Sequence, residues 1–288
     1  MKELSNEYIV RRLAFCQTSF FTWITGWDLS LAGRLLLKDF SNIKGKLRGW
    51  TERSAEWYER ASDFTGYYDR LVEKLLPLLG KESRCCEIAC GTGVMARKIA
   101  PHVSSYTAND MDPVAVSYLR QKLSGPGLPD IEVIEGEWQK VLQGRKFDIL
   151  IASYYGVPED FWPFLRSITT EKFIAVCPRS EKWKRSGNRS GDPEKDMDRQ
   201  PRKLETPDRI RDFYQSHGIP FESFPLDLEF GQPFKDREEA ESYVWHYYRL
   251  DGSEAEQFID EKTCLQNGVL YFPKRKQIEV ISADLSGI

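Results

Sequence analysis

The residues best suited to chemistry lie in one short stretch of the chain, 87–93, which reads Glu-Ile-Ala-Cys-Gly-Thr-Gly. A short, largely apolar run precedes it, and residues 94–100 carry apolar side chains at helical spacing. This pattern predicts a strand, a glycine turn and a helix. One glycine allows a positive φ in the turn, and another lets N–H groups at the helix start approach a ligand closely. We therefore expect a binding loop, with the Glu87 carboxylate facing the same site from the end of the strand.

Two kinds of ligand-binding loop fit these residues. Residues 91–96 match the dinucleotide fingerprint G-x-G-x-x-A, and a glycine turn without a ligand is the simplest alternative. The stretch also resembles motif I of the class I S-adenosylmethionine (AdoMet) methyltransferases, Asp/Glu-x-Gly-x-Gly-x-Gly, in a familiar variant where alanine replaces the first glycine. The resemblance implies AdoMet as the cofactor. The cofactor contacts that it implies here are Glu87, Ala89, Cys90, Gly91 and Gly93.

A second acidic residue follows the loop at a spacing that suits either cofactor. Residues 105–111 predict a strand that ends at Asp110, 19 residues after the first loop glycine. A carboxylate at this spacing can accept hydrogen bonds from ribose hydroxyls. The resemblance implies that Met111 packs on the adenine ring. It also implies that Glu137, after a third strand at 131–134, accepts a hydrogen bond from the adenine amino group.

Trp138 and the end of a fourth strand complete the expected site. Trp138 either lies against the adenine ring or packs in the core. Residues 146–153 form an apolar run bounded by polar residues, which is typical of a central parallel strand. The resemblance places the end of this strand opposite the transferred methyl group and makes Ser153 a cofactor contact; the Asn/Asp-Pro-Pro-Tyr signature of DNA amino methyltransferases is absent. The candidate catalytic bases are Tyr154, Tyr155 and His246.

Aromatic residues are frequent before the binding loop. Apolar residues recur at helical spacing over 57–79, which predicts helices divided at Gly66. In the methyltransferases a helix in this place covers the cofactor. Residues 1–54 predict a helical extension that packs on the main domain or forms a lid or homodimer surface. The candidate AdoMet contacts among the helical tyrosines, with core packing as the alternative, are Tyr58, Tyr67 and Tyr68.

The rest of the chain predicts an α/β domain over residues 55–288. Short apolar segments after the fourth strand predict three more strands, the last over 268–283 with a bulge near its proline. With the resemblance, they imply a doubly wound, mostly parallel seven-stranded sheet of order 3-2-1-4-5-7-6 with an antiparallel last strand. Residues 179–205 are expected as a mobile loop, and residues 231–267 as a cap-like insertion between strands six and seven.

Composition excludes several classes of protein. The chain has 41 basic and 44 acidic residues, so it lacks the strongly basic footprint of a nucleic-acid binder. None of the six cysteines forms a C-x-x-C pair, so we expect no metal site, and adjacent buried cysteines suit reduced thiols in a cytoplasm. The sequence has no apolar run long enough to predict a transmembrane helix.

We therefore expect an AdoMet-dependent methyltransferase with a small-molecule acceptor. Residues 227–261 hold eleven acidic and three basic residues and several aromatic ones. They predict either a solvated acidic helix or a lid over an apolar site that favours a neutral or cationic acceptor over a polyanion. One competing function is a protein or RNA methyltransferase, and the basic residues in 179–205 are its only support in the sequence. Another is a non-catalytic AdoMet- or nucleotide-binding module.

Overall fold

The computed structural model describes residues 49–179, 203–204 and 206–287 of the chain. Those from Trp50 onward belong to one compact unit. The helices and the dimer surface predicted for residues 1–54 fall largely outside the described residues, as does most of the loop predicted at 179–205. These predictions, and the domain boundary at residue 55, stay predictions.

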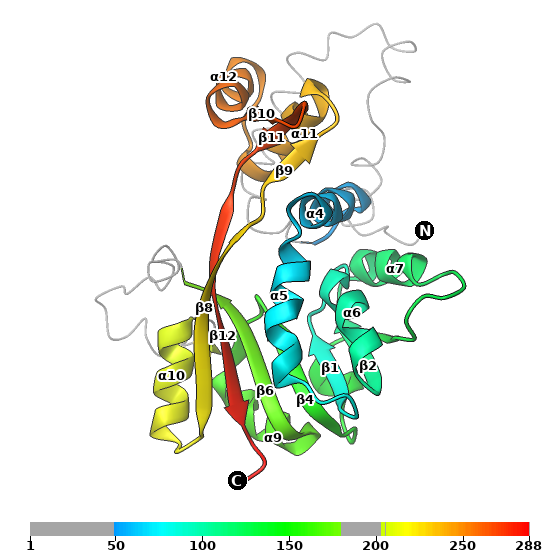
Figure 1. Ribbon diagram of the computed structural model, residues 1–288, viewed down its shortest axis with the longest axis vertical. Coiled ribbons are helices and arrows are strands. Elements are labelled where there is room, and N and C mark those ends of the chain that lie inside the picture. Colours follow the sequence, from blue (N-terminus) through cyan, green and yellow to red (C-terminus); the bar gives the residue numbers. More distant parts are fainter. Residues whose placement is uncertain (1–48, 180–202, 205, 288) are drawn as a thin grey trace, which may run out of the picture. The chain divides into compact units, whose positions relative to one another are not determined.

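Seven strands form the central sheet (Figure 1). In spatial order they are β3 (Glu132–Glu135), β2 (Ser105–Asp110), β1 (Arg84–Ile88), β4 (Phe147–Ser153), β6 (Thr169–Pro178), β12 (Arg275–Asp284) and β8 (Phe221–Glu229). The pairs from β3 to β6 are parallel, whereas β12 runs antiparallel to both of its neighbours. Counted along the chain, this order is 3-2-1-4-5-7-6, so the predicted fold class is confirmed.

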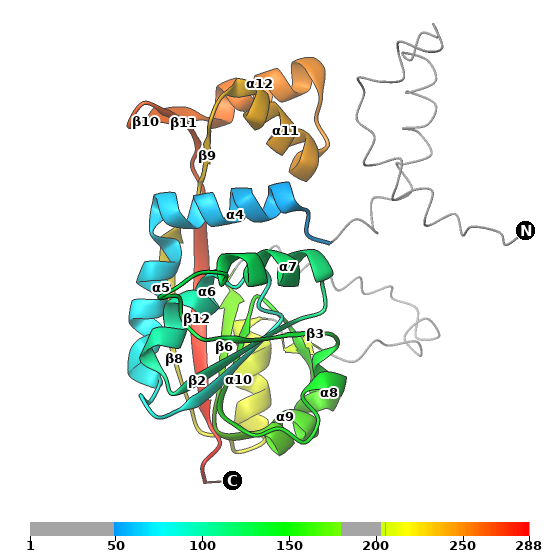
Figure 2. The ribbon, with the colours of Figure 1, turned by 90° about the vertical axis from the view of Figure 1, so that its right-hand side faces the viewer.

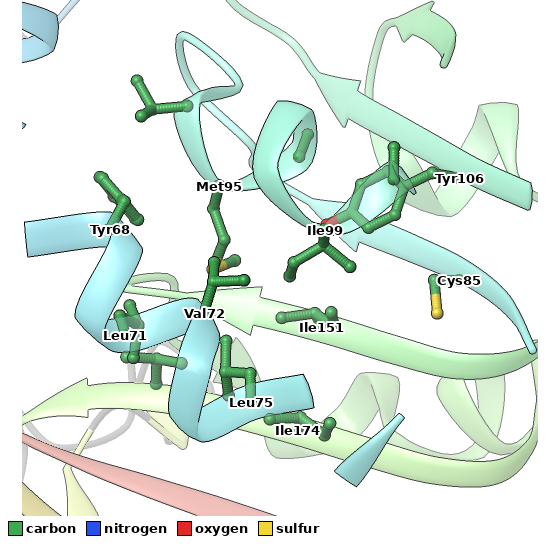
Figure 3. Close-up of a cluster of buried hydrophobic side chains, with 14 of the residues drawn as sticks. Tyr68, Leu71, Val72, Leu75, Cys85, Met95, Ile99, Tyr106, Ile151 and Ile174 are labelled. Atoms are coloured by element: carbon green, nitrogen blue, oxygen red, sulfur yellow. The ribbon is translucent and has the colours of Figure 1, made fainter. Parts of the chain in front are cut away.

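Helices cover both faces of this sheet. They are α5 (Tyr67–Leu75), α6 (Val94–Ile99), α7 (Pro113–Lys122), α8 (Trp138–Val141), α9 (Trp162–Ile168) and α10 (Pro207–Ser216). On β1, Cys85 lies in the core formed with α5 and α6, which Figure 3 shows, whereas Cys86 lies in the core formed with α8, α9 and α10. Burial on both faces explains why the central strands read as apolar runs rather than as alternating ones.

Short elements connect these strands and helices. Three are 3₁₀ turns: η2 (Leu76–Leu78), η3 (Ala100–His102) and η4 (Glu159–Phe161). Two further strands of two residues each, β5 (Val157–Pro158) and β7 (Lys203–Leu204), pair antiparallel with one another in a separate small sheet.

Helix α4 (Glu52–Thr65) begins at a capping box and ends at a glycine. The Ser54 N–H donates to Thr51 Oγ1, and the Thr51 N–H donates back to Ser54 Oγ, so two otherwise unpaired N–H groups gain acceptors. Gly66 adopts φ +62° at the C-cap, a conformation that glycine takes without strain. The chain then enters α5, and the predicted division at Gly66 is confirmed.

The insertion after β8 is a small α/β cap. It comprises β9 (Gln232–Phe234), α11 (Arg237–Tyr248), α12 (Gly252–Lys262), β10 (Cys264–Gln266) and β11 (Val269–Phe272). The prediction of one last strand over 268–283 is wrong, because β11 pairs with β9 and β10 in a separate sheet. Pro273 follows β11, and it lacks the N–H that a continuous ladder would use. The inserted segment is therefore longer than predicted.

Helix α4 lies between this cap and the helices of the central sheet in both ribbon views (Figure 1, Figure 2). Trp57 of α4 is buried with Phe234 and Tyr243 of the cap. The Glu239 carboxylate accepts the Trp57 indole N–H at 3.2 Å and both terminal nitrogens of Arg60 at 2.6 and 2.9 Å. Because a bidentate, half-buried ion pair fixes orientation as well as distance, the cap is held on α4.

Candidate functional site

The glycine loop joins the carboxyl end of β1 to α6. The Asp110 carboxylate accepts the Gly91 N–H at 2.7 Å and the Asp112 N–H at 2.9 Å, so it braces the loop from the end of β2. Its burial raises the pKa of Asp110 above the ordinary value. The predicted partners Gly91 and Asp110 are therefore brought together, and in this conformation the acid also supports the loop backbone.

The two loop glycines both have positive φ and differ in what surrounds them. Gly93 has φ +68°, and a Cβ there would lie 2.4 Å from Leu119 of α7. Gly91 has φ +56°, and a Cβ there would lie 3.2 Å from the ring of Trp50. Gly93 thus allows close packing of the loop on α7. At Gly91 the Trp50 ring occupies the space that a side chain would need, and the predicted close approach of a ligand to the loop backbone stays a prediction.

Glu87 is buried at the end of β1. The Tyr106 hydroxyl donates to its carboxylate at 2.9 Å. Burial raises the pKa of Glu87 to about 8; the Tyr106 hydrogen bond opposes this, and the nearby Asp110 charge adds to it. Near neutral pH the group is therefore poised to gain a charge when a cationic or hydrogen-donating ligand arrives.

Two non-glycine residues with positive φ mark the same edge of the sheet. Ala89, which replaces the first motif glycine, has φ +54°, and Tyr154 has φ +55°. Both residues follow neighbouring strands, because Ile88 of β1 pairs with Ala152 of β4. Positive φ is uncommon for residues such as alanine and tyrosine, and strained backbone of this kind clusters at functional sites. The ends of β1 and β4 therefore form one site.

Two buried hydroxyl oxygens in the described part of this site have no hydrogen-bond partner. They are Thr92 Oγ1 in the loop and Ser153 Oγ at the end of β4. A buried polar atom without a partner is costly, so a polar ligand would stabilise this arrangement. These two hydroxyls fit a cofactor that carries hydroxyl, amino and carboxylate groups, as AdoMet does.

The residues predicted to hold adenine differ in exposure: Met111 and Glu137 are exposed, whereas Trp138 is buried. Met111 is 68% exposed just beyond Asp110, so its side chain is free to cover a ring. Glu137 is also exposed and pairs with Lys140. Trp138 is buried against Phe161 and Phe164, and its indole N–H donates to the Tyr155 hydroxyl at 3.0 Å. In this structure Trp138 thus follows the core alternative.

The three candidate bases are not brought together. Tyr154 lies at the end of β4, and its hydroxyl is 2.6 Å from that of Tyr67; burial raises the pKa of Tyr154 above its ordinary value. Tyr155 bonds to Trp138 in the opposite core. His246 packs on Trp57 and Tyr247 at the face of the cap, where burial lowers the pKa of the imidazole. Only Tyr154 lies directly beside the ends of β1 and β4.

A cluster that sequence reasoning missed surrounds Lys276, near the start of β12. Its Nζ lies 3.6 Å from the ring centroid of Phe230, 4.6 Å from Tyr154, 4.9 Å from Tyr67 and 5.3 Å from Tyr58. We call these four rings the aromatic box. The sequence had marked the tyrosines only, because Lys276 follows Lys274 and Arg275 and so resembles a solvated basic run.

The aromatic box is connected to the glycine loop. Trp50 contacts Tyr58 edge to face at 5.3 Å and also approaches Gly91. The hydroxyls of Tyr58 and Tyr68 are 2.5 Å apart, which links α4 to α5 behind the box. The box and the loop therefore lie at the same carboxyl edge of the parallel strands, where ligands bind in open α/β sheets.

Across the described ranges, no three His, Cys, Asp or Glu side chains converge as metal ligands. None of the helices in the described part of the chain is both long and apolar enough to cross a bilayer.

Comparison with known proteins identifies one family. Residues 86–170 match the family described as "Methyltransferase domain", and the search of curated proteins found no match. Among solved structures, the YcgJ protein from Bacillus subtilis is 13% identical with a TM-score of 0.46, over 77% of this chain and 99% of that one. Magnesium protoporphyrin IX methyltransferase from Synechocystis PCC 6803 with bound SAM is 11% identical with a TM-score of 0.42, over 98% and 99%. These structural likenesses are too distant to assign an acceptor.

Proposed function

We propose that this chain, which carries a class I AdoMet-dependent methyltransferase domain, transfers the methyl group of its cofactor to a small organic acceptor. The family match begins within β1 and continues into β6, so it includes the glycine loop, Asp110 and the end of β4. The enzyme class and the cofactor follow from that match. The acceptor is the part that we infer from the site itself.

The observation that supports a small acceptor is the convergence of aromatic rings beside the loop. The rings of the aromatic box come from four segments: α4, α5, the end of β4 and the end of β8. Sites lined by aromatic side chains with few polar groups suit small organic molecules. A polynucleotide would instead need an extended basic surface, and the cap beside this site is acidic.

The chemistry required of the protein is mainly positioning. AdoMet supplies an electrophilic methyl carbon, so the acceptor must be held in line with it and water must be kept out. The Asp110 carboxylate and the two loop glycines hold the binding loop in shape. Tyr67 fixes the Tyr154 hydroxyl, and the four rings give the acceptor an apolar wall.

Cofactor binding and turnover test this proposal directly. Calorimetry is expected to detect AdoMet binding and no NAD binding. Formation of S-adenosylhomocysteine is then measured with small phenols, carboxylic acids, amines and thiols, and in parallel with total RNA and a peptide mixture. Turnover with small molecules supports the proposal. Turnover that requires RNA or peptide would refute the small acceptor while leaving the enzyme class intact.

The cap is expected to act as a lid on the acceptor side. Phe230 N–H donates to the Lys274 carbonyl at 2.8 Å, so a Gly-Ser turn replacing residues 231–273 would close β8 onto β12 without the cap. We expect the shortened protein to bind AdoMet and to lose acceptor methylation. Because removal of the cap exposes Trp57, the replacement is best combined with Trp57→Ser. Methylation at the rate of the full-length Trp57→Ser protein would exclude the lid.

A further inference from the structure

Lys276 is an unusual residue for its surroundings. Four aromatic rings lie within 5.3 Å of its ammonium, and no carboxylate or other hydrogen-bond acceptor in the described part of the chain pairs with it. Cation–π contacts recover part of the cost of burying the charge, but an ammonium has three N–H donors that aromatic faces satisfy poorly. Lysines are rarely placed this way without a partner.

Neighbouring groups do not supply the missing negative charge. Burial raises the pKa of Tyr58 to about 12 and also raises the pKa values of Tyr67, Tyr68 and Tyr154, so these phenols are neutral at pH 7. Lys274, which immediately precedes β12, adds a second positive charge. The acids of β8 are engaged elsewhere: Glu229 accepts the Tyr271 hydroxyl at 2.6 Å, and Asp227 pairs with Arg275 at 2.8 Å.

The Lys276 side chain is nevertheless not fully enclosed. Lys276 keeps part of its surface exposed to solvent, so the rings surround it without sealing it. It lies on β12 opposite Leu228 of β8, and its side chain extends to the Tyr154 ring at the end of β4. The unpaired cation thus lies against Tyr154, which directly follows Ser153 at the end of β4.

We propose that Lys276 binds the methyl acceptor and that this acceptor is a small aromatic acid, whose ionised carboxylate or phenolate oxygen pairs with the ammonium inside the aromatic box. This inference rests on the proposed function and names its substrate class. The ring of such a molecule would stack against the box, while its oxygen would supply the hydrogen-bond acceptor that the ammonium lacks. The same oxygen is the one that we expect to be methylated.

The protons and electrons of this step balance. The acceptor O–H gives its proton to the Lys276 amine when that amine is neutral, and to solvent otherwise. A lone pair of the resulting oxygen forms the new O–C bond as the C–S bond breaks, and the electrons of that bond remain on sulfur. Burial, with a further contribution from Lys274, lowers the pKa of Lys276 to about 7, so both protonation states are available near neutral pH.

The experiment is a lysine-detected NMR titration of the full chain loaded with S-adenosylhomocysteine. Lysine side chains are labelled with ¹⁵N, and the Lys276 signal is assigned by its loss in Lys276→Met. The probes are benzoate, benzamide and benzylamine, which share a ring and differ in charge. We expect benzoate to raise the titration midpoint of Lys276 by at least one pH unit, and benzamide to leave it unchanged.

Binding to variants completes the test. Lys276→Met should weaken benzoate binding at least tenfold, Lys276→Arg should retain part of it, and the matched control Lys274→Met should stay within about threefold of wild type. Equal benzoate affinity in wild type and Lys276→Met would overturn the proposal, as would preferential binding of benzylamine, which would make the box a cage for cations. If Lys276→Met fails to fold, Lys276→Arg assigns the signal instead, because it also lacks the Lys276 ammonium, and the wild-type titration with the three probes still decides.

Failure of this inference and failure of the proposed function are distinguishable. Absence of AdoMet binding would reject the function, whereas the benzoate titration would still report on the acceptor site. AdoMet binding with turnover of amines alone would keep the function and reject an acidic acceptor.

Discussion

Replacing Glu87 with glutamine is expected to make the apo protein more stable at neutral pH and to weaken its binding of AdoMet. Glutamine has nearly the same shape, and its side-chain carbonyl can still accept the Tyr106 hydroxyl that now donates to Glu87 at 2.9 Å. What changes is the charge. Because the carboxyl group is buried, removing its ionisation removes a desolvation cost.

The magnitude follows from the pKa of Glu87, which burial raises from 4.5 to about 8. Below pH 4.5 the carboxyl is protonated in the folded and the unfolded chain, and it costs nothing. Between pH 4.5 and 8 the folded state holds a proton that the unfolded state has lost, so stability falls by about 1.4 kcal/mol per pH unit. The ionisable group therefore costs the apo protein about 3 kcal/mol at pH 7 relative to pH 4.5.

Urea unfolding of the apo proteins between pH 4.5 and 8 measures this cost. The difference in unfolding free energy between Glu87→Gln and wild type should grow steadily in favour of the variant, while Glu82→Gln, an exposed acid just before β1, should show no comparable trend. Calorimetry should show AdoMet binding weakened at least tenfold in Glu87→Gln, the loss expected for a hydrogen bond to a charged group. A difference that stays flat with pH, or unchanged AdoMet affinity, would refute the reasoning.

Three further changes test the loop and its supports. Asp110→Asn should weaken AdoMet binding about tenfold or more, because it removes the charged acceptor of the Gly91 N–H and of the predicted ribose contact; calorimetry measures it, and unaltered affinity would contradict both roles. Gly93→Ala should lower the apo melting temperature by several degrees, since its Cβ would clash with α7 at a positive φ; an unchanged melting temperature would show that the loop relaxes freely. Glu59→Gln should destabilise the protein by about 2 kcal/mol at pH 7, because Glu59 pairs with Arg97 and Lys122. Burial opposes ionisation, but these partners outweigh it and lower the pKa of Glu59, so the stability difference should shrink as the pH falls below the ordinary glutamate pKa. Urea titrations at pH 7 and 4 measure it, and a difference that does not shrink would contradict the ion-pair role.

Local sequence was sufficient to predict the elements that depend on neighbouring residues. The glycine turn after β1 needs positive φ at Gly91 and Gly93, and few residues other than glycine adopt it without strain. Gly66 ends α4 for the same reason. The alternation between strand and helix, together with the resemblance to the AdoMet methyltransferases, predicted the doubly wound sheet, because parallel strands need helical crossovers.

Predictions failed, or did not arise, where two distant segments had to meet. The last strand was expected to begin at residue 268, because an apolar run followed by a proline looks like a bulged strand; only pairing with β9 places Val269–Phe272 in the cap. Trp138 has a partner in Tyr155, and local sequence could not distinguish this core contact from a stacked adenine.

The sequence by itself determined the glycine loop and the acid that follows it, and its resemblance to motif I predicted a methyltransferase. Only the tertiary structure decided which side chains form the acceptor side of the site. β12 enters the sheet between β6 and β8 in the antiparallel direction, so its first residues lie at the carboxyl ends of the parallel strands. That reversal brings Lys276 among Tyr58, Tyr67 and Tyr154, residues that no local pattern relates to it, because side-chain proximity in a sheet depends on strand order and direction rather than on distance along the chain.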